Sequence, residues 1–257
     1  MIISYRHRFI FIHSRKVAGS SISAYLARFL GPEDILIGAW GYAYRAGVRP
    51  NRRAWRDMLH PEARAALFKE ACKRPGRFRS PSRRVALINQ CQKTKYRNVL
   101  GPNPEHPKAQ AIRDFDPEAW RSFYKFCFVR NPFDRLVSDY TWRRKLKDRQ
   151  DVTFSDFLTM LTDPAHDNPL IPRNAYTWPM YTIDDRVAVD RVGRYENLYA
   201  DLDAIAADIG LPALSGRLPN AKQAASGAAF REWYGPSERA RVEALFEKEL
   251  AAFGYTF

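Results

Sequence analysis

Residues 9–21, FIFIHSRKVAGSS, are the stretch that decides the fold. Residues 9–12 form a short apolar run of aromatic and β-branched residues that polar residues close, which is the pattern of a buried strand. Further on, apolar residues recur at helical spacing, at Ile22, Tyr25, Leu26 and Phe29. The stretch therefore predicts a strand, a basic loop of small residues and a helix over residues 20–30.

This order of elements suits a phosphate. Backbone N–H groups at a helix N-terminus point at a bound anion, and the helix dipole favours negative charge there. Lys16 adds a full positive charge, and Ser20 and Ser21 add hydroxyl donors. The loop is not a Walker A motif, in which Lys-Ser/Thr follows the second Gly, because Lys16 precedes Gly19. An ordinary strand-to-helix turn is the alternative interpretation.

A second segment, residues 123–144, reads FYKFCFVRNPFDRLVSDYTWRR. Residues 124–129 have the aromatic and apolar character of a strand, and Pro132 is well placed in the first turn of a helix over residues 132–147. Arg130, at the strand end, offers a planar fork that can bind a phosphate through two hydrogen bonds.

Ser138 lies eight residues beyond Arg130, two turns into that helix. Three further arginines of the same region, Arg135, Arg143 and Arg144, fit a solvated helix face. There we expect Arg135 to pair with Asp139 across one turn.

Together the two segments resemble the two cofactor-binding motifs of sulfotransferases, specifically the membrane-associated carbohydrate group and its bacterial relatives. In that family a Lys-containing loop wraps the 5′-phosphosulfate of 3′-phosphoadenosine 5′-phosphosulfate (PAPS). An Arg at the end of a later strand and a Ser in the next helix bind the 3′-phosphate. The resemblance implies cofactor binding by Arg15, Lys16, Ala18, Gly19, Ser20, Ser21, Arg130 and Ser138.

The resemblance extends to the C-terminal half. Residues 192–198, VGRYENL, match a strand-to-helix junction of the family, and the tail from residue 218 matches its C-terminal pattern. Tyr195 and Glu196 would then border the adenine, although Glu196 could instead simply start its helix near a favourable dipole. Lys222 and Arg217 would reach the 3′-phosphate. Residues 31–110 match least and are expected to be an insertion on the acceptor side of a single domain. Val17 stands where many relatives have Thr.

Sulfuryl transfer needs a base, and a pKa near the working pH favours His. Relatives carry a His at the position of His106, and in some it is the base, so Lys16 and His106 are the expected catalytic residues. A surface His in a Pro-rich turn is the alternative interpretation. His13, Glu33 and Glu105 stay open as other bases. The resemblance implies in-line displacement without a metal.

Composition sets the fold class. The chain has 257 residues, 46% of them hydrophobic, which is enough for one full core. Strands that alternate with helices predict an α/β fold with a mostly parallel central sheet flanked by helices. The predicted helices span residues 20–30, 61–73, 132–147, 154–161, 196–209 and 236–253, with Thr153 capping the fourth.

The net charge of +14, from 42 basic and 28 acidic residues, implies an anionic partner. A doubly phosphorylated cofactor accounts for part of it. Residues 45–84 are the most basic, with Trp40, Tyr42, Tyr44 and Trp55 in or near them. This combination suits a sulfated or uronic-acid glycan, and also RNA or single-stranded DNA, although a solvated insertion would look the same. We expect a carbohydrate acceptor and no nucleic-acid partner.

The three cysteines, Cys72, Cys91 and Cys127, have no metal-binding spacing. An odd count without a secretion signal favours a reducing compartment. Residues 1–14, MIISYRHRFIFIHS, form neither a signal peptide nor a membrane anchor. Animal relatives are anchored in the Golgi, so we expect a cytoplasmic enzyme of bacterial type, unless the sequence is a trimmed form of an anchored one.

The leading hypothesis is therefore a PAPS-dependent sulfotransferase that acts on a hydroxyl, in a carbohydrate. A P-loop-type kinase or nucleotide-binding enzyme shares the strand-loop-helix start, but lacks the Lys after the Gly. A basic nucleic-acid-binding module would need no catalytic His and leaves the spacing of the two motifs unexplained. The identity of the acceptor and the oligomeric state are open.

Overall fold

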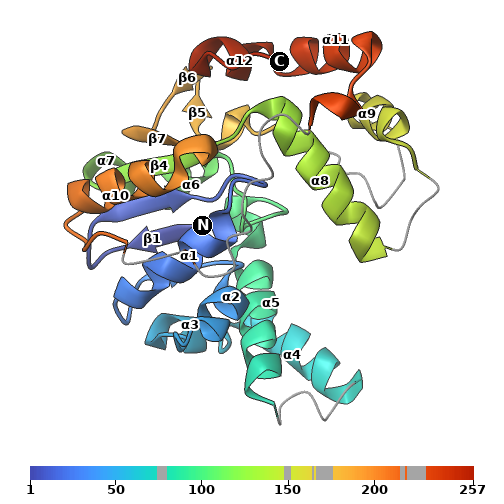
Figure 1. Cartoon of the computed structure of the whole chain (residues 1–257). Helices are drawn as coiled ribbons and strands as arrows, with labels where there is room; N and C mark the ends of the chain where they lie inside the picture. The colour runs from blue at the N-terminus through green and yellow to red at the C-terminus, as the bar shows by residue number, and fades with distance from the viewer. Residues whose placement is uncertain (74–79, 148–151, 164, 166–175, 215–217, 219–229) are drawn as a thin grey trace. The chain divides into compact units, whose positions relative to one another are not determined.

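The computed structural model describes residues 1–73, 80–147, 152–163, 165, 176–214, 218 and 230–257 (Figure 1). The chain divides into two compact units. The first comprises Met1–Phe128 with Pro179–Ala221, and the second comprises Val129–Trp178 with Lys222–Phe257. Each unit is taken by itself below, and the single-domain organisation stays a prediction.

A five-stranded sheet in the order β3-β1-β2-β4-β7 forms the centre of the first unit. Its strands are β1 (Ile2–Ser4), β2 (Phe9–Ile12), β3 (Ile35–Leu36), β4 (Tyr124–Val129) and β7 (Arg191–Arg194). β1 pairs antiparallel with β2 and β3, and β2 pairs in parallel with β4, so β2, β3 and β4 all run the same way. The predicted α/β fold on a largely parallel sheet is confirmed, with β1 making the sheet mixed.

One face of the sheet carries the main core. Side chains alternate along a strand, so Phe9 and Phe11 of β2 share a face, and Phe126 lies beside Phe11 with ring centroids 5.2 Å apart. Helices α1 (Gly19–Leu26) and α10 (Leu198–Asp208) contribute buried apolar residues to the same cluster. Helix α7 (Pro117–Ser122) packs against β2.

Residues 31–110 fold into helices that complete this core. They form α2 (Trp40–Arg45), α3 (Arg52–Asp57), α4 (Pro61–Lys73) and α5 (Pro81–Leu100), and α6 (Ala109–Phe115) begins at their end. Only α4 was predicted from the sequence. Trp40, Ala54 and Ile88 are buried in the same cluster as the sheet, so these helices belong to the body of the first unit. A role on the acceptor side stays a prediction.

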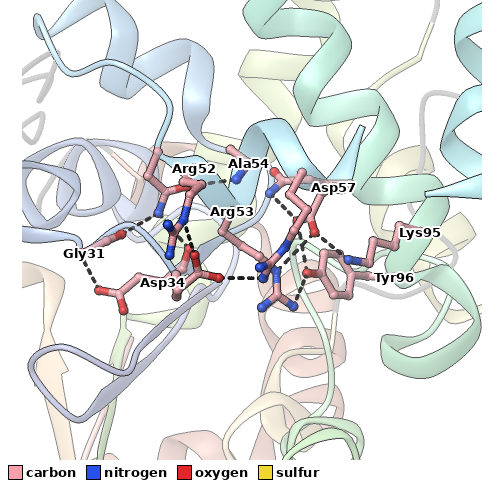
Figure 2. A network of polar contacts seen from close by, with 12 residues as sticks. Gly31, Asp34, Arg52, Arg53, Ala54, Asp57, Lys95 and Tyr96 are labelled. Carbon is pink, nitrogen blue, oxygen red and sulfur yellow. Dashed lines mark hydrogen bonds and ion pairs between the residues drawn. The ribbon is translucent and has the colours of Figure 1, made fainter. Parts of the chain in front are cut away.

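A buried carboxylate joins α3 to α5 (Figure 2). Asp57 is fully buried, and its Oδ1 accepts hydrogen bonds from Arg53 Nε at 3.2 Å and Lys95 Nζ at 2.5 Å. Its Oδ2 accepts from Gln92 Nε2 and the Tyr96 hydroxyl, both at 3.0 Å. Two cations and two neutral donors offset the cost of burying the charge. Some of the basic charge of this region therefore serves the fold.

The remaining elements of the first unit are short. They are the 3₁₀ turns η1 (Ala27–Phe29) and η4 (Tyr195–Asn197), the 3₁₀ turn η3 (Trp178–Met180) at the unit boundary, and the hairpin of β5 (Thr182–Ile183) and β6 (Arg186–Val187). The predicted helix over residues 20–30 is therefore α1 followed by η1, and the one over 196–209 is η4 followed by α10.

The second unit is helical. Its elements are α8 (Pro132–Lys147), α9 (Phe154–Thr162), η5 (Arg231–Trp233), α11 (Pro236–Leu245) and α12 (Glu247–Phe253). Phe133, Tyr140, Phe157 and Phe246 are buried together in its aromatic core. The predicted bounds of α8 are confirmed, and the predicted last helix divides at Phe246 into α11 and α12. Thr153 caps α9 in a capping box with Asp156, as predicted.

The expectation for Arg135 is wrong. This side chain is buried, donates from Nη2 to Glu249 Oε2 at 3.2 Å and lies 4.8 Å from the centroid of the Phe246 ring. Asp139 pairs instead with Arg143, at 3.1 Å. Arg135 faces the core because its turn of α8 packs within the second unit, where a carboxylate distant in the sequence meets it.

No helix within the described residues is long and apolar enough to cross a membrane.

Candidate functional site

Lys16 lies in a loop whose backbone shape is unusual. β2 ends at Ile12 and α1 begins at Gly19, and between them Lys16 has φ 61° and Ala18 has φ 59°. Residues other than glycine rarely adopt these left-handed values, and such strain is concentrated at functional sites. Turns of this kind can aim successive N–H groups at one point and form an anion-binding concavity.

The start of α1 adds donors to this loop. The Ala18 carbonyl oxygen accepts from the backbone N–H groups of Ser21 at 2.9 Å and Ile22 at 3.0 Å, and no side chain caps the helix at Ala18. The N–H groups of Gly19 and Ser20 lie in the first turn, where a helix offers no acceptor of its own. The positive end of the helix dipole therefore meets the Lys16 loop.

Gly19 is required by a close approach. A Cβ at this position would lie 2.0 Å from Cδ2 and 2.2 Å from Nε2 of His13. The His13 ring therefore lies directly against the first residue of α1. Any larger residue than glycine would move either the ring or the helix start, so the small residue of the motif has a specific structural reason.

Ser14 is a residue of this site that the sequence analysis missed. Its hydroxyl is buried and has no hydrogen-bond partner within the described part of the chain. Buried hydroxyls nearly always have a partner, and a bound anion would supply an acceptor. With the N–H groups, Lys16 and the hydroxyls of Ser20 and Ser21, the donor set fits a phosphate ester. A hydroxyl directly after a buried strand was the signal that could have identified it.

His106 lies beside the start of this loop. Its Nδ1 is 2.7 Å from the backbone carbonyl oxygen of His13, and the two imidazole rings meet edge to face with centroids 4.6 Å apart. A carbonyl oxygen can only accept, so Nδ1 carries the hydrogen and Nε2 keeps its lone pair. Burial lowers the pKa of His106 to about 4, so the ring is neutral near pH 7. A neutral imidazole with a fixed lone pair has the form of a general base, and its lowered pKa makes it a weaker base than a free imidazole.

His13 is less suited to be the base. Its side chain is only 8% exposed and stacks on Phe11, with ring centroids 6.0 Å apart. Burial lowers its pKa well below the ordinary value, and the neighbouring His106 lowers it further. Its contribution to the site is the carbonyl group that orients His106.

The two acidic alternatives are held in ion pairs. Glu33 accepts from Arg52 Nε at 2.6 Å and pairs with Arg56 Nη2 at 2.6 Å, and the hydrogen bond from Arg52 lowers its pKa. Burial acts to raise the pKa of Glu105, but the hydrogen bond from Lys93, a backbone hydrogen bond and the charges of Lys93 and His106 together outweigh it, so the pKa is lowered. Both carboxylates are therefore weaker bases than free ones.

The second unit contains the other predicted phosphate ligands. Arg130 is 8% exposed, and its Nε and Nη2 donate to Asp134 Oδ2 at 2.9 and 2.8 Å. Asn131 Oδ1 accepts from the Phe133 N–H at 3.1 Å and so stabilises the start of α8. Ser138 is half-buried and lies one turn beyond Asp134 on the same helix face. Asp134 thus fixes the guanidinium near the helix start.

Strand pairing sets where the Lys16 loop leaves the sheet. β2 and β4 are parallel neighbours, with Ile12 opposite Cys127. Parallel strands end at the same edge of a sheet, so the Lys16 loop follows β2 at the carboxyl-terminal edge of the parallel strands. Tyr195, in the turn after β7, is half-buried against the main core of the first unit, as is Ala18. Lys222 and Arg217 lie outside the described residues.

Among the side chains that the structure describes, no group of three or more His, Cys, Asp or Glu residues could hold a metal ion. That the reaction needs no metal remains a prediction.

Comparison with known proteins identifies the family. A model described as the sulfotransferase family matches residues 1–256. The chain belongs to the sulfotransferase family. This sulfotransferase is 33% identical over 87 residues to an uncharacterized protein of Archaeoglobus fulgidus. The alignment covers 34% of this chain and 68% of that protein.

A solved structure also aligns with this sulfotransferase. The crystal structure of a sulfotransferase from Alicyclobacillus acidocaldarius aligns over 97% of this chain and 99% of that one, with 17% identity and a TM-score of 0.43. The family match confirms that the protein is a PAPS-dependent transferase.

Proposed function

We propose that this sulfotransferase moves the sulfuryl group of PAPS to a hydroxyl of a carbohydrate acceptor, by in-line attack with His106 as the base. The observation that carries the proposal is the 2.7 Å hydrogen bond between His106 Nδ1 and the carbonyl of His13. It attaches a neutral imidazole to the first residues of the Lys16 loop, so base and phosphate loop lie together within the first unit.

The Lys16 loop binds the 5′ end of the cofactor in this proposal. When bound, PAPS supplies the sulfuryl group and a phosphate leaving group. Lys16 and the N–H groups of Gly19 and Ser20 hold negative charge as it grows on the leaving oxygen, which is where prearranged donors lower a barrier most. Further contacts come from Arg15, Ala18, Ser20 and Ser21.

The 3′-phosphate is assigned to Arg130 and Ser138. A guanidinium can donate two parallel hydrogen bonds to a phosphate, and a helix hydroxyl adds a third. Support comes from the Asp134 carboxylate, which holds the Arg130 guanidinium at the start of α8. Tyr195 is assigned to the adenine, and Lys222 to the 3′-phosphate, on the family pattern alone.

His106 performs the proton transfer. Its Nε2 accepts the proton of the acceptor hydroxyl while that oxygen forms a bond to sulfur. The bond between sulfur and the bridging phosphate oxygen breaks, and the electron pair stays on the phosphate. No covalent bond to the protein forms, so positioning and charge stabilisation account for the rate.

The acceptor side is assigned to the helices of residues 31–110. Trp55, 44% exposed, lies on α3 between Arg52 and Arg56, and the guanidinium of Arg45 stands 4.7 Å from the ring centroid of exposed Tyr42. Aromatic faces suit sugar rings, and arginines suit carboxylates or sulfates. The odd count of three cysteines, with Cys91 and Cys127 buried, favours a reducing, cytoplasmic location.

Calorimetric titration with 3′-phosphoadenosine 5′-phosphate (PAP), against ATP with magnesium, tests the cofactor. Tight binding of PAP that His106→Ala retains supports the proposal. Release of PAP from PAPS is then followed in the presence of unsulfated uronic-acid oligosaccharides, where His106→Ala is expected to lose roughly 10²- to 10⁴-fold in rate. A preference for ATP with magnesium, or salt-sensitive binding of single-stranded RNA in place of PAP, would overturn it.

A further inference from the structure

An ion pair anchors the residue that precedes His106. Glu105 Oε1 accepts a hydrogen bond from Lys93 Nζ, and the two side chains are 18% and 39% exposed. Lys93 lies in the middle of α5, a helix of twenty residues whose buried face packs in the first unit. The pair therefore links a long, fixed helix to the loop of the base.

Glu105 is also confined on a second side. Gly38 has φ +83°, and a Cβ placed on it would lie 2.5 Å from Glu105 Cβ. The turn between β3 and α2 thus approaches Glu105 so closely that a glycine is needed there. Lys93 and the Gly38 backbone together leave the Glu105 side chain little freedom.

This confinement is transmitted to His106 through a short and stiff stretch. Pro104 and Pro107 flank the two residues and are buried, and proline fixes one backbone dihedral. The His106 N–H donates to the Asn103 carbonyl at 2.8 Å. A displacement of Glu105 would therefore move the imidazole away from the His13 carbonyl rather than be absorbed by the loop.

We propose that Lys93 and Glu105 are positioning residues for His106. Their ion pair keeps His106 Nδ1 within hydrogen-bond distance of the His13 carbonyl oxygen. The inference rests on the proposed function only in treating His106 as the base, since the position of its side chain can be measured without an activity assay. A half-buried pair is suited to this role, because removal of one partner leaves a charge without its counterion in a partly dry site.

Lys93→Met and Glu105→Gln test the pair, with Lys95→Met as the matched control. Lys95 lies two residues along the same helix and pairs with fully buried Asp57, so its loss removes a more deeply buried ion pair away from His106. Lys93→Arg, which keeps the charge, should behave like the unaltered protein. If Glu105→Gln fails to fold, Glu105→Asp takes its place. This variant keeps the charge but shortens the reach to Lys93, so the same effect on His106 is expected.

Two measurements distinguish a positioning role of the ion pair from a purely stabilising one. Nitrogen-15 NMR of histidine should show His106 with the hydrogen on Nδ1 in the unaltered protein and in Lys95→Met, and a mixture of tautomers in Lys93→Met. The maximal rate of PAP release from PAPS should fall about 10- to 100-fold in Lys93→Met, while the PAP dissociation constant is unchanged, as expected for a misplaced catalytic group.

The inference is overturned if Lys93→Met and Glu105→Gln only lower the thermal midpoint, as Lys95→Met does, and leave the His106 signals as they were. A different result would reject the proposed function instead. If Lys93→Met alters the tautomer of His106 but neither it nor His106→Ala slows PAP release, His106 is positioned as inferred and is not the base.

Discussion

The two phosphate motifs of this chain are built in different ways. The Lys16 loop is shaped by its backbone, with left-handed values at Lys16 and Ala18 and a glycine pressed against His13. The Arg130 segment is shaped by side chains, because Asp134 fixes the guanidinium from one helical turn away. The comparison teaches that the first motif should be sensitive to any change in backbone freedom, and the second to the loss of single functional groups.

Removal of the Lys16 charge should have the largest effect. Lys16→Ala keeps a side chain at the strained φ, whereas Lys16→Gly relieves that strain, and both should lose about 10²- to 10³-fold in the rate of PAP release from PAPS. The glycine variant should be the more stable of the two in thermal unfolding. Lys145→Ala, at an exposed site on α8, serves as the control. A near-normal rate in Lys16→Gly would mean that the backbone alone holds the phosphate.

Gly19→Ala should come next. The new Cβ would overlap the His13 ring, and overpacking of this kind costs about 1–3 kcal/mol. PAP affinity, measured by calorimetry, should fall about 10- to 100-fold because the helix start moves. Gly41→Ala in α2, where the nearest atom would lie 3.9 Å away, should bind PAP normally and unfold at an equal or higher temperature. Equal behaviour of the two variants would contradict the backbone account of the first motif.

Arg130→Ala should weaken PAP binding by about tenfold or more, since even one charge-assisted hydrogen bond contributes about 1.5–3 kcal/mol. Adenosine 5′-phosphosulfate, which has no 3′-phosphate, should bind the variant almost as well as it binds the unaltered protein. Calorimetry with both ligands gives the answer. An equal loss for both would show that Arg130 does not contact the 3′-phosphate.

Asp134→Asn should have the smallest effect, a loss of PAP affinity of about two- to fivefold, because the guanidinium must then be ordered on binding. The thermal midpoint should also fall, since the buried Arg130 guanidinium loses the Asp134 carboxylate. A gain in PAP affinity would instead show that the Asp134 carboxylate competes with the phosphate for Arg130.

Local patterns in the sequence were enough to predict β2, α8 and the capping box of α9. Each of these depends on neighbours within a few residues, such as the apolar run at residues 9–12 or the Pro at the start of α8. Helix α5 was missed although it has twenty residues. Its sequence is mostly polar, and its apolar stripe at Val85, Ile88 and Tyr96 is interrupted by Asn, Gln and Lys.

Contacts between residues that are far apart in the chain could not be predicted from the sequence. The partner of Arg135 was expected four residues away at Asp139, but the structure places it at Glu249, 114 positions along the chain. The four donors to Asp57 come from two helices, and no spacing indicates that they meet. His106 was selected through its family position, whereas the carbonyl that orients it lies 93 residues earlier and could not be found from a pattern.

The hydrogen bond between His106 and the His13 carbonyl has a consequence for the direction of the imidazole. His13 is the first residue after β2, so the peptide that orients the imidazole is part of the same short chain that carries Lys16. The direction of the imidazole lone pair therefore depends on the conformation of the chain that carries Lys16, and any movement of that chain would turn the imidazole as well.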